Sequence, residues 1–190
     1  MKQGYEFILQ ATYDKPAYQA LSAASWVLFR RRQMQVAAYP VLFALAALVG
    51  AMLIFNWGNY GPPILIGGLA FMGLQFLVIP LGAASAKAKM TRLAVKADRK
   101  QGRYPAQIQL VFSAEQIHAT RNGETTASPY SDIDCLVALG DWRLLFFGRA
   151  AYILHTSCFQ DSGELERFEK FICEKCELPF NQMKGRGPKR

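Results

Sequence analysis

The sequence predicts a membrane protein of mixed α and β structure. A transmembrane helical hairpin is inserted between an N-terminal strand and helix and a C-terminal antiparallel β domain that is closed by a helix. Three observations predict this class. Residues 33–86 form a run of 54 residues without a single Asp, Glu, Lys, Arg or His. Apolar and polar residues alternate from Tyr104 onward, which is typical of strands. A helix start signal at Asp161 follows the last alternating run.

Residues 1–32 are expected to form a strand and an amphipathic helix ahead of the hairpin. The stretch from Tyr5 to Thr12 is rich in residues that favour strands, and Asp14 with Pro16 is typical of a helix start. Because a single strand needs a partner, and the nearest sheet follows the hairpin, we expect this strand to pair with the C-terminal β domain. The hairpin is then an insertion into one folded unit.

The uncharged run over residues 33–86 is long enough for two membrane spans. A bilayer core needs about 20 apolar residues per helix, and we expect spans near residues 36–57 and 62–84 with a turn between them. Gln75 is the one strongly polar side chain near the centre of a span. We expect it to make a hydrogen bond between the two helices.

Basic residues flank both ends of the predicted hairpin. By the positive-inside rule they place both chain ends on the cytoplasmic side, and they can contact anionic lipid headgroups. Residues 87–103 carry basic side chains at helical spacing and predict a basic juxtamembrane helix. The net charge of +8 is concentrated there and in the tail, which argues against nucleic acid as a partner. The expected membrane-surface residues are Arg30, Arg31, Arg32, Lys87, Lys89, Arg92, Lys96, Arg99 and Lys100.

Residues 104–178 predict an antiparallel β domain that ends in a helix. Asn122-Gly123, between two alternating runs, predicts a tight β-hairpin turn. Asp161 followed by Glu164 predicts the start of the closing helix, and Pro179 predicts its end. Residues 179–190 are expected to form a basic, flexible tail. Four further strands are expected over residues 125–130, 133–139, 142–147 and 150–156.

The order of these segments resembles the YcxB-like family. The resemblance rests on a short strand and helix, two predicted spans, and a Tyr130-Ser131-Asp132-Ile133 step ahead of a hydrophobic meander. It implies a multi-pass protein of the bacterial inner membrane, with a cytoplasmic domain similar to the pleckstrin-homology fold. Family members often carry Pro-Lys near the end of the last strand, where this chain has residues 155–157, His-Thr-Ser. The resemblance implies a fold and names no activity.

No motif of an enzyme or of a cofactor site is present in the sequence. The chain lacks a P-loop, an HExxH motif, a GxSxG elbow and a Rossmann fingerprint, so we expect neither catalysis nor a cofactor. The four cysteines are expected to be reduced and structural, without a bound metal. The CxxC spacing at Cys173 also suits half of a zinc site or a redox pair, so a thiol- or zinc-dependent membrane protein is an alternative. Its candidate ligands are Cys135, Cys158, Cys173 and Cys176.

The sequence favours a non-enzymatic, membrane-anchored binding or regulatory module. Its β domain is expected to meet a protein partner or the lipid surface, and an immunity-type inhibitor is a special case of this reading. The candidate partner-binding residues are Tyr130, Asp132 and Trp142. A subunit of a small oligomeric channel or transporter is a third reading, which requires a homo-oligomer.

Overall fold

The computed structural model describes residues 5–30, 81–148, 150–183 and 188, together with short pieces between residues 43 and 73 (43–44, 46–51, 54, 66–67, 70 and 73). The chain divides into two compact units. The first unit combines Met1–Ser25 with Met90–Arg190, and the second unit is Trp26–Lys89. The two halves of the first unit are therefore separated in sequence by the whole of the second unit.

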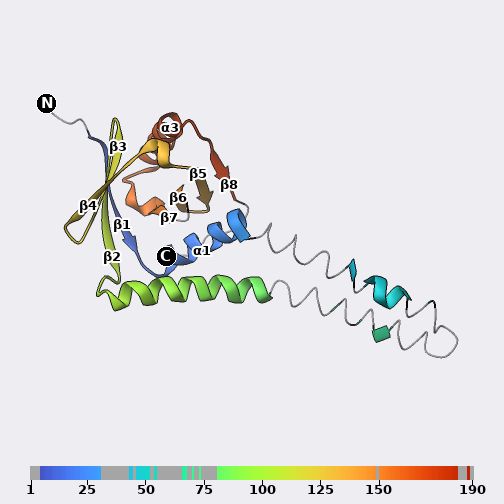
Figure 1. Ribbon diagram of the computed structural model, residues 1–190. Helices are drawn as coiled ribbons and strands as arrows, with labels where there is room; N and C mark the ends of the chain where they lie inside the picture. The colour runs from blue at the N-terminus through green and yellow to red at the C-terminus, as the bar shows by residue number, and fades with distance from the viewer. Residues whose placement is uncertain are drawn as a thin grey trace. The chain divides into compact units, whose positions relative to one another are not determined.

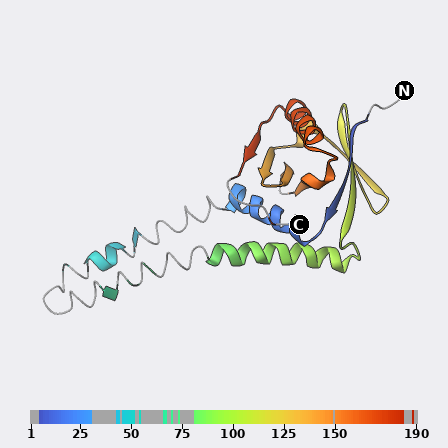
Figure 2. The same cartoon turned by 180° about the vertical axis from the view of Figure 1, so that it is seen from behind.

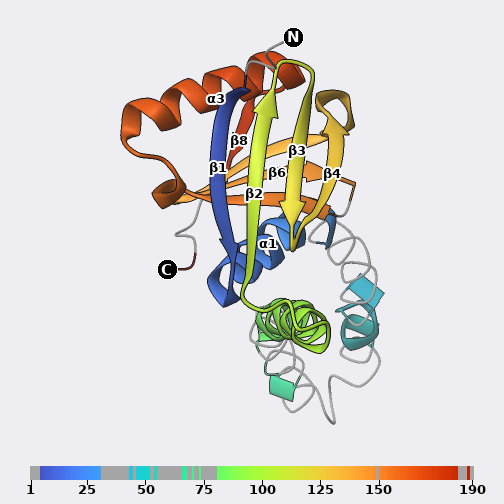
Figure 3. The same ribbon diagram turned by 90° about the vertical axis from the view of Figure 1, so that its left-hand side faces the viewer.

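An antiparallel sheet of four strands in the order β1-β2-β3-β4 forms one layer of the first unit (Figure 3). Leu9 of the first strand lies opposite Leu110 of the second, so the predicted pairing of the N-terminal strand with the C-terminal domain is confirmed. Asn122 and Gly123 have φ values of 52° and 83°, as the predicted hairpin turn between β3 and β4 requires. The strands are β1 (Tyr5–Tyr13), β2 (Ala106–Ser113), β3 (Gln116–Arg121) and β4 (Glu124–Pro129).

The second sheet has the order β7-β6-β5-β8, and its strands run across those of the first sheet (Figures 1 and 3). Gly140 and Gly148 adopt φ values of 56° and 60° in the turns that follow β5 and β6, a conformation that glycine adopts without steric cost. The last strand pairs in parallel with β5, whereas the other pairs are antiparallel. The strands are β5 (Cys135–Leu139), β6 (Trp142–Phe147), β7 (Ala150–His155) and β8 (Phe180–Gln182).

Helix α3 (Ser162–Cys176) closes the β domain. Asp161 caps it, because its Oδ1 atom accepts a hydrogen bond of 2.6 Å from the backbone N–H of Glu164. The carboxylate of Glu164 in turn accepts a hydrogen bond from the backbone N–H of Gln160, the residue before the cap, so the helix begins where the sequence predicts. The ring of Phe168 is fully buried and contacts that of Phe112, with 5.0 Å between their centroids. The helix therefore packs its apolar side on the first sheet.

The first unit contains two more helical segments. Helix α1 (Lys15–Ser25) follows β1. A further helix extends over residues 81–100; its part over residues 90–100, which belongs to the first unit, is called the basic helix below. Three short helical pieces are η1 (Trp26–Arg30) of the second unit, and η2 (Tyr130–Asp132) and η3 (Thr156–Cys158) of the first. Figure 2 shows the same elements from behind.

The predicted transmembrane hairpin over residues 33–86 is contradicted by the structure. Among the described residues, no helix is long and apolar enough to cross a membrane. The helix over residues 81–100 carries seven charged residues, which are costly to place inside a bilayer, so this helix is not a membrane span. Most of the expected spans, 36–57 and 62–84, lie outside the described residues. The same finding contradicts the predicted multi-pass location in the bacterial inner membrane with both chain ends cytoplasmic.

Candidate functional site

The inner side of the basic helix carries polar residues that are buried against α1. Thr91 donates a hydrogen bond of 3.0 Å from Oγ1 to Oγ of Ser22, and both residues are buried. About two turns further along the helix, the phenolic O–H of Tyr18 donates a hydrogen bond to a carboxylate oxygen of Asp98. Polar groups that are buried in this way hold two elements in one relative position, because each would be costly to leave unpaired.

Arg121, at the end of β3, joins the same cluster. Its Nη2 atom lies 2.8 Å from Oδ2 of Asp98 in an ion pair, without the alignment of a hydrogen bond. Its Nε–H group is buried and has no hydrogen-bond acceptor among the described residues. Asp98 thus receives the Tyr18 hydroxyl and the Arg121 guanidinium together. We call Tyr18, Asp98 and Arg121 the buried cluster.

Tyr13 extends the polar contacts of this region toward the second sheet. Its hydroxyl oxygen accepts a hydrogen bond of 2.8 Å from the backbone N–H of Ile153, and its ring meets that of Tyr18 edge to face, with centroids 6.2 Å apart. Burial raises the pKa of both tyrosines well above the ordinary value, and for Tyr18 the neighbouring Asp98 carboxylate adds to this. Both hydroxyls therefore stay protonated at neutral pH.

The outer side of the basic helix is positively charged. Four exposed basic residues lie on this side. Between Lys15 and Ala114 the sequence has no acidic residue other than the buried Asp98. The guanidinium of Arg99 lies over the ring of Tyr104, 5.0 Å from its centroid, which orients this side chain. Leu93 is 57% exposed on the same helix. We call the four residues the basic face: Arg92, Lys96, Arg99 and Lys100.

The three predicted partner-binding residues do not form one surface. Tyr130 is buried, and its hydroxyl donates a hydrogen bond of 2.7 Å to the backbone oxygen of Ser113. Asp132 is exposed at the end of η2. Trp142 is only 1% exposed, and its Nε1–H donates to the backbone oxygen of Pro188 at 2.8 Å. Two of the three therefore belong to the core, and only Asp132 is accessible.

The four cysteines are reduced and half-buried. Within the described part of the chain, which includes all four, no group of three or more His, Cys, Asp or Glu residues is arranged to hold a metal ion. Burial, together with the neighbouring Cys173, raises the pKa of the Cys176 thiol to about 11. A thiol with a raised pKa is a weak nucleophile at neutral pH, so this geometry gives no support to the thiol- or zinc-dependent alternative.

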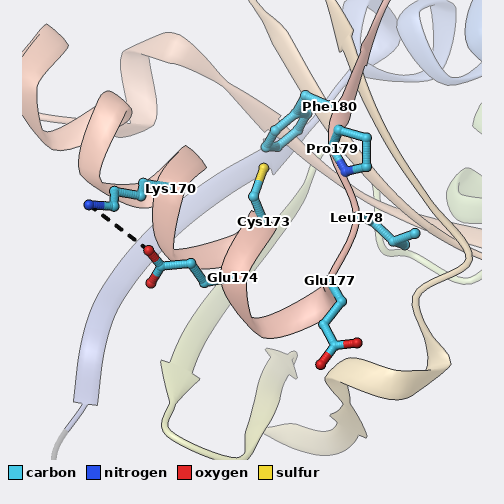
Figure 4. A pocket seen from close by; sticks show the side chains of 7 residues that line it. All are labelled: Lys170, Cys173, Glu174, Glu177, Leu178, Pro179 and Phe180. Carbon is cyan, nitrogen blue, oxygen red and sulfur yellow. Dashed lines mark ion pairs between the residues drawn. The ribbon is translucent and has the colours of Figure 1, made fainter.

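A shallow hollow lies where α3 ends and β8 begins (Figure 4). It has a volume of about 430 Å³ and is open to solvent. Its floor is apolar, and Lys170 and Glu174 form an ion pair of 4.0 Å at its rim. The lining residues are Lys170, Cys173, Glu174, Glu177, Leu178, Pro179 and Phe180.

The remaining predicted site residues lie in or near the second unit. Lys87 is half-buried and Lys89 is exposed. Arg30 ends η1, whereas Arg31, Arg32 and Gln75 lie outside the described residues. The lipid contacts of the basic residues and the interhelical contact of Gln75 stay predictions.

Sequence reasoning found the basic face but missed the buried cluster behind it. Tyr18 and Asp98 are 80 positions apart, and no motif joins them. One signal was available, because Asp98 stands alone as an acid among basic residues of one helix. Such an isolated charge indicates an internal ion pair.

Comparison with known proteins gives one match. Residues 112–172 match the sequence model of the family described as YcxB-like protein, and this confirms the predicted resemblance. The matched segment extends from β2 into α3 and includes the Tyr130-Ser131-Asp132-Ile133 step. No curated protein matches the chain. No solved structure matches it either, so the likeness to the pleckstrin-homology fold stays a prediction.

Proposed function

We propose that this chain, with its YcxB-like segment over residues 112–172, is a non-enzymatic binding module that recognises an acidic surface of a protein partner through its basic face. The observation that carries the proposal is the separation of charge across one helix. The single acid, Asp98, points inward and is paired with Arg121, whereas the basic side chains point outward. The outward charge is therefore not neutralised from within.

Charge on the outer side is available to a partner. Among the described residues, no acidic side chain forms an ion pair with Arg92, Lys96 or Lys100. Exposed charges of one sign attract a complementary surface and speed its association. An acidic protein surface would supply the carboxylates that guanidinium and ammonium groups bind.

The helix that carries the basic face is held in place before any partner arrives. Thr91 is hydrogen-bonded to Ser22, and Asp98 is hydrogen-bonded to Tyr18, so two side-chain hydrogen bonds about two turns apart join the basic helix to α1. The contact with Arg121 ties both to β3. Binding to a fixed face loses less conformational entropy than binding to a mobile one.

The spacing of the charges favours a protein surface over a small anion. Arg92, Lys96 and Lys100 follow one another at intervals of four residues, so they form a row of about 12 Å at a rise of about 1.5 Å per residue. A single phosphate or carboxylate cannot meet all of them. The exposed Leu93 beside this row offers an apolar contact of the kind found in protein interfaces.

The test compares two variants with the same loss of charge. Lys96→Gln/Lys100→Gln neutralises part of the basic face, and Arg167→Gln/Lys175→Gln removes two exposed charges from α3 as the matched control. Partners are captured by cross-linking from cells that produce the protein, identified by mass spectrometry and then titrated in purified form. We expect the first variant to bind about tenfold more weakly, and the control to bind as the natural chain does.

Lipid binding is the competing outcome. Sedimentation with vesicles of phosphatidylglycerol, compared with phosphatidylcholine, measures it for the same three proteins. Binding to anionic vesicles that depends on Lys96 and Lys100, without a captured protein, would replace the acidic protein surface by a lipid surface. If the two double variants behave alike in both assays, the basic face has no binding role.

A further inference from the structure

We infer that the outer edge of β5 is a site for an extended peptide of a partner, and that the chain's own residues 180–183 occupy this site in the structure. The peptide adds as a strand to β5 and places an aromatic side chain where Phe180 now lies. This inference concerns the second sheet and is independent of the basic face. The two surfaces involve different elements and can be tested separately.

The edge of β5 needs a covering strand. Leu136, Val137 and Ala138 are 0%, 0% and 2% exposed, so this strand is buried on both of its faces. On one side it pairs with β6. Its other side would present unpaired backbone N–H and C=O groups, and such an edge readily accepts another strand.

The strand that covers this edge is small and polar. It has three residues and pairs in parallel, with Phe180 opposite Leu136 and Gln182 opposite Ala138. Asn181 and Gln182 are exposed. One further backbone bond, from the N–H of Met183 to the oxygen of Ala138, measures 2.9 Å. A short segment held chiefly by backbone hydrogen bonds opens at a low free-energy cost.

The hollow beside β8 indicates the chemistry of the peptide. Phe180 and Pro179 lie at its wall, and the thiol of Cys173 points toward Phe180 (Figure 4). When the segment leaves, the place of the Phe180 ring beside Cys173 can take an aromatic or large aliphatic side chain. Glu174 and Glu177 at the rim complement a basic residue next to it. The occupant is therefore an extended segment with an aromatic and a basic residue, as in the chain's own sequence, where Lys184 follows Phe180 by four positions.

Trp142 contacts the chain at a later position, Pro188. Its indole N–H donates to the backbone oxygen of Pro188, so a residue that follows the covering strand supplies the acceptor for a tryptophan that is otherwise buried. A partner peptide that displaces the segment would have to replace this acceptor or leave the indole unpaired. The NMR signal of the Trp142 indole N–H therefore reports the displacement.

The first experiment uses the full chain and two substitutions at one position. Met183→Pro removes the N–H that bonds to Ala138, whereas Met183→Ala keeps it and serves as the matched control. The probe is a synthetic peptide with the sequence of residues 178–190, added in trans and followed by NMR. We expect the peptide to bind the proline variant at concentrations at least tenfold lower than the alanine variant, with amide shifts at Leu136, Val137 and Ala138. The same peptide with Phe180→Ala should not bind.

Equal binding to both variants, or shifts away from β5, would overturn the inference. The natural chain provides a second measurement that requires no substitution, and it decides the matter if the proline variant fails to fold. Hydrogen exchange at the Met183 amide should be at least 100-fold faster than at the Leu144 amide in the central strand β6, because the covering segment opens locally. Exchange of both amides at the same rate would show that β8 is a permanent part of the sheet.

Discussion

At the scale of single residues, the central feature is a carboxylate that serves two donors. Asp98 accepts from the Tyr18 hydroxyl and pairs with the Arg121 guanidinium, although the three residues come from α1, the basic helix and β3. A carboxylate removed from water is stable only with such partners. The Asp98 side chain therefore holds these three elements in their relative positions.

Replacement of Asp98 by Asn tests this role. The substitution keeps the size of the side chain and removes its charge, which leaves the Arg121 guanidinium without its ion pair. We expect the free energy of unfolding to fall by about 2 kcal/mol, as measured by urea denaturation. Arg121→Met should cost a similar amount, and the double variant should cost less than the sum of the two. Additive effects would contradict a shared cluster, and Arg167→Met on the exposed side of α3 is the control, with an expected change within about 0.5 kcal/mol.

The thiol of Cys176 offers a test by pH. Burial and the neighbouring Cys173 raise its pKa from 9.0 to about 11, so at pH 8 its thiolate fraction is about 100-fold below that of an ordinary thiol. We expect alkylation by iodoacetamide, followed by mass spectrometry, to be slower by about this factor and to increase up to about pH 11. A midpoint near pH 9 would contradict the burial. Because the folded state holds the thiol proton of Cys176 more tightly than the unfolded state does, this thiol stabilises the fold fully below pH 9, and its contribution is lost as the pH rises through 11. The Cys176→Ser variant should not show this loss of stability.

At the scale of elements, helix α3 depends on the signals that mark its start in the sequence. Asp161 caps the helix, and the Glu164 carboxylate accepts a hydrogen bond from the backbone N–H of Gln160. Asp161→Ala removes the acceptor for the Glu164 N–H, and we expect the free energy of unfolding to fall by about 1 kcal/mol in thermal or urea unfolding. Asp161→Asn keeps an oxygen in place and should cost only a few tenths of a kcal/mol. An equal loss in both variants would assign the effect to the charge of Asp161 and not to the cap.

Local signals in the sequence were sufficient to predict most of the strands that follow β3. The range expected from the sequence for β6, residues 142–147, agrees with the structure, and those for β4, β5 and β7 differ by one or two residues at one or both ends. These strands are bounded by residues such as Asn122, Gly140 and Gly148, whose positive φ values are a local property of turns. Strand β8 was not foreseen, because its three residues have no periodicity and it forms only against a strand more than 40 positions earlier.

The membrane prediction shows the limit of composition as a guide. The uncharged run over residues 33–86 predicted two spans from composition alone, whereas among the described residues no helix is long and apolar enough to cross a membrane. The long helix in the described residues includes the last six residues of that run, 81–86, and continues through the basic residues that follow it. Its inward Asp98 and outward Lys96 fit a helix on the surface of a folded domain. The basic helix expected over residues 87–103 corresponds to the helix over residues 81–100, and its position beside a membrane stays a prediction.

At the scale of the whole molecule, one folded unit is assembled from two distant parts of the chain. Residues 1–25 supply β1 and α1, and residues 90–190 supply the remainder. The YcxB-like match over residues 112–172 begins inside β2 and ends inside α3. It therefore covers less than the unit that folds. The missing parts include β1, which pairs with β2 along its length.

The N-terminal strand should consequently be required for folding of the domain. Leu9 and Ala11 are 2% and 3% exposed, and Phe7 contacts the ring of Phe168 with 5.4 Å between centroids. We expect a fragment of residues 90–190 to give a poorly dispersed NMR spectrum, because the apolar side chains of β2 lose their cover. Addition of a peptide of residues 5–25 should restore dispersion, and the same peptide with Leu9→Asp should not, since it would bury an unpaired charge. A well-dispersed spectrum of the fragment alone would show that residues 90–190 fold without the N-terminal strand, and that β1 is an added edge strand.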